Sequence, residues 1–155
     1  MSLTDYPGLI SAIVFTQGCN LRCPYCYNHN LNATEAEEGD TPTQEVLDFL
    51  EKRKGKLDAL VVTGGEPTLQ SDLENFLKRV REKGYSVKLD TNGSMPERIK
   101  DLWEKELFDY IALDLKAPWD KYENVSGVRV DTHQFQDSFS YVIEKDIPHE
   151  FRTTM

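Results

Sequence analysis

Residues 18–29 of the chain read Gly18-Cys19-Asn20-Leu21-Arg22-Cys23-Pro24-Tyr25-Cys26-Tyr27-Asn28-His29. This stretch contains every cysteine of the protein, in a Cys-x3-Cys-x2-Cys spacing, and it follows an apolar run that ends at Phe15. Three thiols on one short loop can face one inorganic group, because the thiolate is the metal-binding form of cysteine. A site with only three protein ligands keeps one metal position free for a reactive molecule. The spacing by itself also allows a structural zinc site in which His29 is the fourth ligand.

The bulk composition is that of an ordinary globular protein. The length of 155 residues fits one domain that can bury its own core. The net charge of -9 argues against a nucleic-acid partner, because phosphate binding needs a basic surface. The chain has no apolar run long enough to span a membrane, and its first residues lack the basic and apolar regions of an export signal. We therefore expect a cytoplasmic protein with no membrane partner.

Short apolar runs alternate with helical periodicities along the chain. The runs predict strands at residues 9–15, 57–63, 85–89, 110–115 and 147–155. The periodicities predict helices at residues 41–55, 71–84, 96–108 and 132–145. This alternation predicts an α/β fold with a parallel sheet that curls into a twisted partial barrel. We expect one domain over residues 1–155 that is incomplete at its carboxyl end, because the chain stops within the fifth predicted strand.

Polar or glycine-rich clusters follow each of the first four predicted strands. After the cysteine stretch come Gly64-Gly65-Glu66-Pro67, Asp90-Thr91-Asn92-Gly93 and Asp114-Leu115-Lys116. Ligands of parallel α/β sheets bind beyond the carboxyl ends of the strands, so these clusters are expected to share one surface. Each cluster alone could be structural, as a strand-ending turn, a helix-entry turn or a surface ion pair. A zinc staple would require none of the last three, so their coincidence favours a cofactor site.

The glycine cluster offers a specific kind of contact. Gly64 and Gly65 would let the backbone approach a ligand edge-on, so that carbonyl groups accept from an ammonium group. Glu66 would add negative charge to the same contact. We therefore expect Glu66 to face the ligand.

The Cys-x3-Cys-x2-Cys motif after a first strand resembles the signature of radical S-adenosylmethionine (radical SAM) enzymes. Two further stretches are similar to activases of glycyl-radical enzymes: Thr4-Asp5-Tyr6-Pro7-Gly8 and Val14-Phe15-Thr16-Gln17-Gly18-Cys19-Asn20. Within these activases the chain most resembles activators of anaerobic ribonucleoside-triphosphate reductase, which are close to pyruvate formate-lyase activase. The resemblance covers nearly the whole chain and implies a partial (β/α) barrel of the radical SAM type.

The resemblance also implies a set of cofactor contacts. Cys19, Cys23 and Cys26 would hold a 4Fe-4S cluster whose fourth iron binds the amino and carboxylate groups of S-adenosylmethionine. The glycine-rich segment would hold the amino group of S-adenosylmethionine through Gly64, Gly65 and Glu66. A monovalent cation beside the carboxylate of S-adenosylmethionine would be surrounded by Asp90, Thr91 and Asp114. Further contacts with S-adenosylmethionine are expected from Tyr25, Asn92, Lys116 and Arg152.

The implied activity is that of an oxidoreductase which reductively cleaves S-adenosylmethionine and generates a glycyl radical on a partner enzyme. The resemblance makes anaerobic ribonucleotide reductase the expected partner, and a flavodoxin or ferredoxin the expected electron donor. No catalytic acid, base or nucleophile is expected beyond the cofactor ligands. Two alternatives remain open. The chain could be a radical SAM enzyme for a small molecule or peptide, or a shortened, inactive module that binds the cluster and S-adenosylmethionine.

Two further expectations concern the rim of the site. Tyr27 stands where many relatives have histidine, and we expect its ring to pack against the cluster or the adenine, with His29 left as a loop residue. The partner's glycine-bearing loop is expected to enter beside Ser126-Gly127-Val128, which we expect to be a short loop after the fourth strand.

Overall fold

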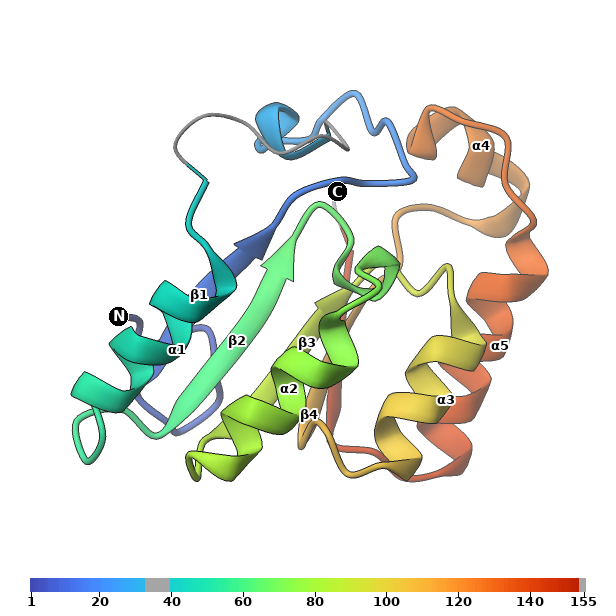
Figure 1. Cartoon of the computed structure of the whole chain (residues 1–155). Helices are drawn as coiled ribbons and strands as arrows, with labels where there is room; N and C mark the ends of the chain where they lie inside the picture. The colour runs from blue at the N-terminus through green and yellow to red at the C-terminus, as the bar shows by residue number, and fades with distance from the viewer. Residues whose placement is uncertain (33–39, 154–155) are drawn as a thin grey trace.

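The computed structural model describes residues 1–32 and 40–153, and it contains one parallel sheet with the strand order β1-β2-β3-β4-β5 (Figure 1). The strands are β1 Ser11–Thr16, β2 Ala59–Gly64, β3 Ser86–Thr91, β4 Tyr110–Asp114 and β5 His149–Arg152. The α-helices are α1 Thr43–Lys52, α2 Leu73–Glu82, α3 Pro96–Glu104, α4 Tyr122–Ser126 and α5 Thr132–Glu144. Three short 3-10 helices complete the described elements: η1 His29–Asn32, η2 Pro67–Leu69 and η3 Trp119–Lys121.

The predicted fold class is confirmed, with five parallel strands and four long helices near the predicted positions. The expectation of a simple loop at residues 126–128 is wrong. Ser126 is the buried last residue of α4, and Gly127 caps that helix with a φ of 71°. The last two residues of the fifth predicted strand lie outside the described residues, and β5 ends at Arg152.

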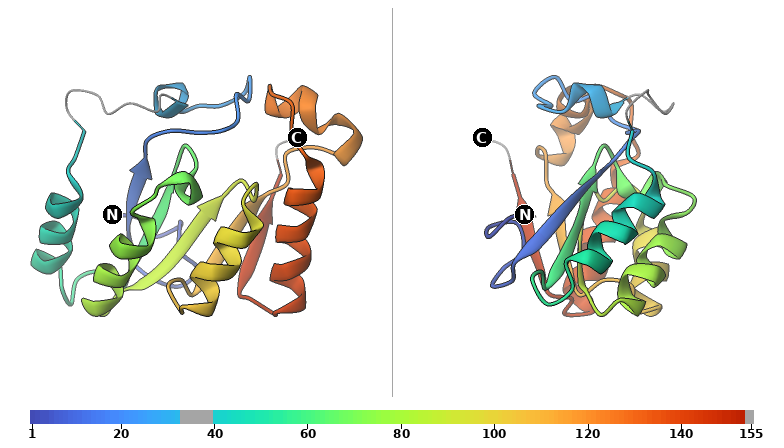
Figure 2. Two further views of the ribbon diagram at one scale, coloured as in Figure 1. Left: turned by 45° about the vertical axis from the view of Figure 1, so that its right-hand side comes forward. Right: turned by 60° about the vertical axis from the view of Figure 1, so that its left-hand side comes forward.

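The four long helices, α1, α2, α3 and α5, cover one face of the sheet (Figure 2). Alternate strand residues point to this face and are buried against them, for example Leu60 and Val62 of β2 and Ile111 and Leu113 of β4. Because the strands follow one another in sequence order with their crossover helices on one side, the sheet curls around its other face. The result is the predicted partial barrel.

The inner face of the sheet has an apolar half and a polar half. On the apolar half, the N-terminal segment covers β1 and β2, where Tyr6 packs with Ala59 and Val61. On the polar half, the parallel register aligns Asp90 with Ala112 and Asp114 with Arg152. Charged residues therefore share the inner face of β3, β4 and β5: Lys88, Asp90, Asp114, Glu150 and Arg152.

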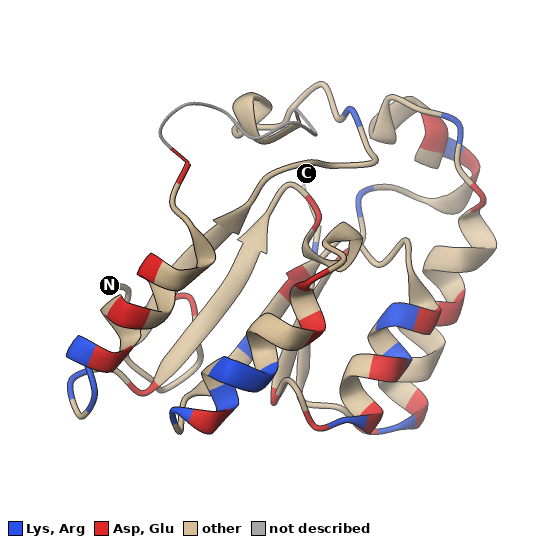
Figure 3. Cartoon of the chain, in the orientation of Figure 1, with Lys and Arg blue, Asp and Glu red and all other residues tan. Residues whose placement is uncertain are grey.

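Most of the charged residues lie on the helices and near the amino ends of the strands (Figure 3). Within residues 17–32, which contain the cysteines, Arg22 is the only Lys, Arg, Asp or Glu. The cysteine segment is thus a weakly charged part of a chain with a net charge of -9. In the part of the chain that the structure describes, none of the helices is both long enough and apolar enough to cross a membrane.

Candidate functional site

The four sequence clusters meet at one end of the sheet, where the carboxyl ends of β1 to β4 open into loops (Figure 1). Hydrogen bonds join the clusters in series. Gly18 accepts from the backbone N–H of Glu66 at 2.8 Å, and Glu66 accepts from the backbone N–H of Asn92 at 2.7 Å. Lys116 ion-pairs with Asp114 at 3.0 Å. The predicted common surface is therefore present.

The three cysteines sit in a mostly apolar environment behind β1. Cys23 is buried in a cluster with Leu21, Tyr122 and Phe135, and Cys19 and Cys26 are half-buried against the same cluster. All three are free thiols. Burial raises the pKa of the Cys19 thiol, and the backbone N–H of Leu21, 3.4 Å from its Sγ, opposes that shift.

Two neighbours face these thiols. The Lys116 ammonium lies 6.0 Å from the ring centroid of Tyr25. Burial lowers the pKa of Lys116, but the charges of Asp114, Cys23 and Cys19 outweigh burial and raise it overall. The Tyr25 hydroxyl is buried and finds no hydrogen-bond partner among the described residues. Burial and the adjacent Cys23 raise the pKa of Tyr25.

These surroundings fit an iron–sulfur cluster. As the side chains stand, no group of three His, Cys, Asp or Glu residues within residues 1–32 and 40–153 is arranged to hold a metal ion. The fit rests instead on three free thiols on one loop, on an apolar environment that excludes water, and on the cation Lys116 beside two of them. Zinc held by His29 is less well supported, because the His29 side chain is exposed at the start of η1.

The cysteine loop is fixed by close backbone contacts with β2. Gly65 donates its N–H to Thr16 at 2.9 Å, and a Cβ on Gly65 would overlap the carbonyl groups of Gly18 and Leu31. Gly64 has a φ of 130°, and a Cβ there would overlap the backbone of Thr16. Both glycines therefore serve the approach of one chain segment to another, whatever their role toward a ligand.

Glu66 has a role that differs from the expected one. Its side chain is fully buried, and its carboxylate accepts hydrogen bonds from both the backbone N–H and the hydroxyl of Thr68, from the Thr91 hydroxyl, and from the Asn92 N–H. Burial raises the pKa of the Glu66 carboxyl, and these four donors oppose the shift. With four protein donors, this carboxylate ties the exits of β2 and β3 together and does not face a ligand.

Asn92 continues this network toward the cysteine loop. Its side chain donates to Asn20 at 2.9 Å and accepts from the N–H of Ser94 at 2.9 Å, while Asn20 donates to the Ser94 hydroxyl at 2.8 Å. Asn20, within the cysteine stretch, and Ser94 are contacts that the sequence analysis missed. No periodicity predicts them, because both lie in loops.

Arg152 joins the two aspartates at the ends of β3 and β4. Its Nη1 is 2.8 Å from Asp90 Oδ2, and its Nε is 3.1 Å from Asp114 Oδ1. Burial raises the pKa of Asp90, whereas Arg152 and Lys88 oppose the shift. The pairs Lys88-x-Asp90 and Glu150-x-Arg152 place charges on alternate residues of two predicted strands, and this pattern could have predicted the polar face.

A hollow of about 490 Å³ opens beside Lys116 on this end of the sheet. It is lined mainly by apolar side chains, among them Leu115, Pro118, Trp119 and Val125. Such a lining with one cationic side chain suits a ligand that has both a flat apolar part and a negative group. Tyr27, by contrast, is fully exposed, and its packing against a cofactor stays a prediction.

Gly127 sets how closely α4 approaches the cysteine loop. The backbone N–H of Arg22 donates to Ser126 at 2.8 Å, and a Cβ on Gly127 would overlap the carbonyl of Arg22. Gly127→Ala is expected to lower the free energy of unfolding by about 2 kcal/mol or more, because left-handed strain and this overlap add. Denaturant unfolding measures the loss, and amide exchange of Arg22 reports whether the loop is released.

The matched control is Gly84→Ala. Gly84 has a φ of 88°, but a Cβ there would meet nothing within 4 Å. The control therefore carries the backbone strain without the overlap. Equal losses in both variants would show that the contact between Gly127 and Arg22 contributes nothing.

The chain was compared with known protein families and sequences. The model of the radical SAM superfamily matches residues 13–155. Two Methanocaldococcus jannaschii proteins, each named as a glycyl-radical enzyme activating enzyme, are 39% and 33% identical to it over 93% and 83% of this chain. A 7-carboxy-7-deazaguanine synthase of Methanopyrus kandleri is 31% identical over 73% of this chain. These matches cover 59%, 48% and 52% of the relatives, so the chain spans about half their length.

Solved structures share the fold. The tagged enzyme anSMEcpe with bound AdoMet superposes with a TM-score of 0.66 over 92% of this chain and 41% of that one, at 22% identity. TYW1 with a lysine-pyruvate adduct gives a TM-score of 0.57 over 90% of this chain and 53% of that one, at 15% identity. At these identities the likeness concerns the arrangement of strands and helices alone.

Proposed function

The chain belongs to the radical SAM superfamily, and on this basis we propose that it acts as an activating enzyme that generates a glycyl radical on a partner protein. The observation that carries the proposal is the loop of three free cysteines at the carboxyl end of β1, beside Lys116 and an apolar hollow. The two relatives named as activating enzymes support the finer assignment.

In the proposed reaction, a reduced 4Fe-4S cluster supplies one electron that breaks the sulfur–C5′ bond of S-adenosylmethionine, and the resulting 5′-deoxyadenosyl radical takes a hydrogen atom from a glycine of the partner. The chain binds and orients the reactants. Cys19, Cys23 and Cys26 hold the cluster. The Lys116 ammonium attracts the carboxylate of S-adenosylmethionine, and the apolar hollow beside it excludes water from the flat part of that molecule.

The remaining proposed contacts lie on the same loops. Gly64, Gly65 and Asn92 offer backbone and amide groups to S-adenosylmethionine, and Tyr25 offers its buried hydroxyl. Glu66 acts behind them by holding these loops in place. The proposed partner is anaerobic ribonucleotide reductase, with a flavodoxin or ferredoxin as the electron donor.

The test is anaerobic reconstitution with iron and sulfide, followed by reduction with and without S-adenosylmethionine. The expected results are an electron paramagnetic resonance signal that S-adenosylmethionine perturbs, formation of 5′-deoxyadenosine, and a glycyl radical on added anaerobic ribonucleotide reductase. A parallel sample without iron is the control for each signal.

Other outcomes decide between the alternatives. Cleavage of S-adenosylmethionine without a glycyl radical on any glycyl-radical enzyme would favour a small-molecule or peptide substrate. Iron binding without cleavage would indicate a binding module. Uptake of zinc but not iron would contradict the proposal as a whole.

A further inference from the structure

Arg152 of β5 occupies the space in which a monovalent cation was expected. Its guanidinium group binds Asp90 through Nη1 at 2.8 Å and Asp114 through Nε at 3.1 Å. Asp90 and Asp114 are two of the three residues that would have surrounded such an ion. A single protein cation therefore already bridges both carboxylates.

The third expected ligand is also engaged. The Thr91 hydroxyl donates to Glu66 at 2.5 Å and accepts from the N–H of Gly93 at 3.2 Å. Since this hydroxyl has a donor role toward a buried carboxylate and an acceptor role toward a backbone N–H, little of its capacity remains for an ion. The predicted monovalent cation site therefore does not fit the residues as the structure arranges them.

The charges of the polar inner face balance without an added ion. Three cations, Lys88, Lys116 and Arg152, face three carboxylates, Asp90, Asp114 and Glu150. Three positive and three negative charges sum to zero. A bound monovalent ion would leave one uncompensated positive charge in a region where Lys88 and Asp90 are almost fully buried.

The register of β4 makes this bridge possible. Asp90 of β3 and Glu150 of β5 flank Ala112 on the same face of the sheet. The small side chain of Ala112 leaves room for long side chains to reach across β4. Lys88 uses this room to reach Glu150 at 2.8 Å, and Arg152 uses it to reach Asp90.

We infer that the Arg152 guanidinium is a built-in replacement for a bound monovalent cation between Asp90 and Asp114, so that the polar face needs neither Na⁺ nor K⁺. The inference concerns residues of this chain and does not depend on the proposed activity. The Arg152 side chain is 41% exposed, and Nη2 makes no hydrogen bond within the described residues, so the group also presents a positive charge outward.

The test is thermal unfolding of the protein without cluster or S-adenosylmethionine, in KCl, NaCl and N-methylglucamine chloride at equal ionic strength. The wild-type midpoint is expected to be the same in all three salts. Arg152→Ala is expected to lower it by about 3–8 °C in N-methylglucamine, because two carboxylates lose their shared cation. Saturating K⁺ or low millimolar methylguanidinium should restore a large part of this loss.

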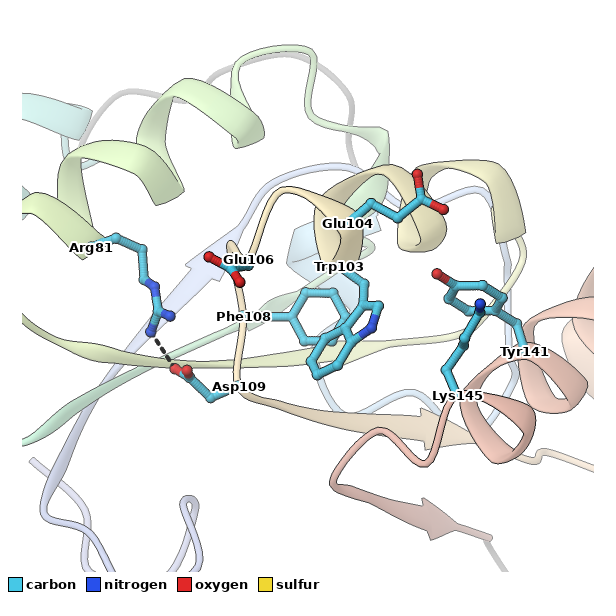
Figure 4. Close-up of a pocket in the computed structure, with 8 residues that line it drawn as sticks. All are labelled: Arg81, Trp103, Glu104, Glu106, Phe108, Asp109, Tyr141 and Lys145. Atoms are coloured by element: carbon cyan, nitrogen blue, oxygen red, sulfur yellow. Dashed lines mark hydrogen bonds and ion pairs between the residues drawn. The ribbon is translucent and has the colours of Figure 1, made fainter.

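Arg81→Ala is the matched control. Arg81 bridges Asp109 at the opposite, amino end of the strands, beside a separate hollow of about 490 Å³ (Figure 4). Its loss should destabilise the protein without creating a response to K⁺. Where Arg152→Ala does not fold, Arg152→Gln removes the charge and keeps most of the side chain.

Two results would overturn the inference. One is a wild-type midpoint that rises saturably with K⁺ or Na⁺ relative to N-methylglucamine. The other is a folded Arg152→Ala or Arg152→Gln variant that responds to K⁺ and methylguanidinium no more than Arg81→Ala does. Neither readout involves cleavage of S-adenosylmethionine, so failure of this inference and failure of the proposed function are distinguishable.

Discussion

Replacing Cys26 with serine is expected to abolish cluster assembly and to reduce cleavage of S-adenosylmethionine by more than about 100-fold, since even residues that only support metal ligands cost 10- to 100-fold when lost. A serine hydroxyl stays protonated at neutral pH and is a hard ligand, whereas iron–sulfur clusters select soft thiolates. Cys26 is the best of the three to change, because it is half-buried and Cys23 lies deep in the apolar cluster. The measurements are iron content after reconstitution and the yield of 5′-deoxyadenosine.

The control for this variant is Asn30→Ala. Asn30 lies on the same segment, its side chain is exposed, and its backbone carbonyl supplies its contact with Gln17. It should reconstitute like the wild type. Thermal unfolding of the cluster-free proteins shows whether Cys26→Ser still folds. A Cys26→Ser protein that keeps full iron content and full cleavage would remove Cys26 from the ligand set.

Replacing Glu66 with leucine is expected to lower the free energy of unfolding by about 3–5 kcal/mol. Leucine has a similar size but no acceptor, so the hydroxyl and N–H of Thr68, the Thr91 hydroxyl and the Asn92 N–H would all lose their buried partner. Unfolding in urea, followed by far-ultraviolet circular dichroism, measures the change. The loops that carry the cysteines and Asn92 should also exchange their amide hydrogens faster.

Two companion variants show where the effect comes from. Thr68→Val deletes one donor and keeps the carboxylate, so it should cost much less than Glu66→Leu. Glu97→Leu changes an exposed glutamate at the start of α3 and should leave the unfolding midpoint nearly unchanged. A loss below about 1 kcal/mol for Glu66→Leu would show that water or rearranged loops satisfy the four donors, and the structural role assigned to Glu66 would be wrong.

The sequence predicted the sheet and the meeting of its loops because both follow from local patterns. Alternation and apolar runs locate strands such as β2 and β3, and parallel strands necessarily bring their carboxyl ends to one edge. The role of Glu66 could not be predicted in the same way. A carboxylate after two glycines can turn toward a ligand or toward Thr91, and that choice depends on the packing of two loops that are 25 residues apart in the chain.

The same limit explains the outcome at Asp90 and Asp114. Their placement at the ends of β3 and β4 was predictable, and it made a cation between them chemically reasonable. Whether the cation is an ion or Arg152 depends on the register of β5 against β4 and on the small size of Ala112. Register between strands is a long-range property that one sequence specifies only through the complete packed sheet.

The sequential strand order has a consequence for how the chain folds. Because each strand pairs with the strand that precedes it in the sequence, most of the sheet can form by short loop closures, in the order in which the chain is synthesised. Two contacts break this locality: Tyr6 meets Tyr110, and Arg152 meets Asp90. They span the growing sheet and can form only when β4 and β5 have docked. These two contacts are therefore expected to form late and to have low φ-values, so that their loss speeds unfolding more than it slows folding.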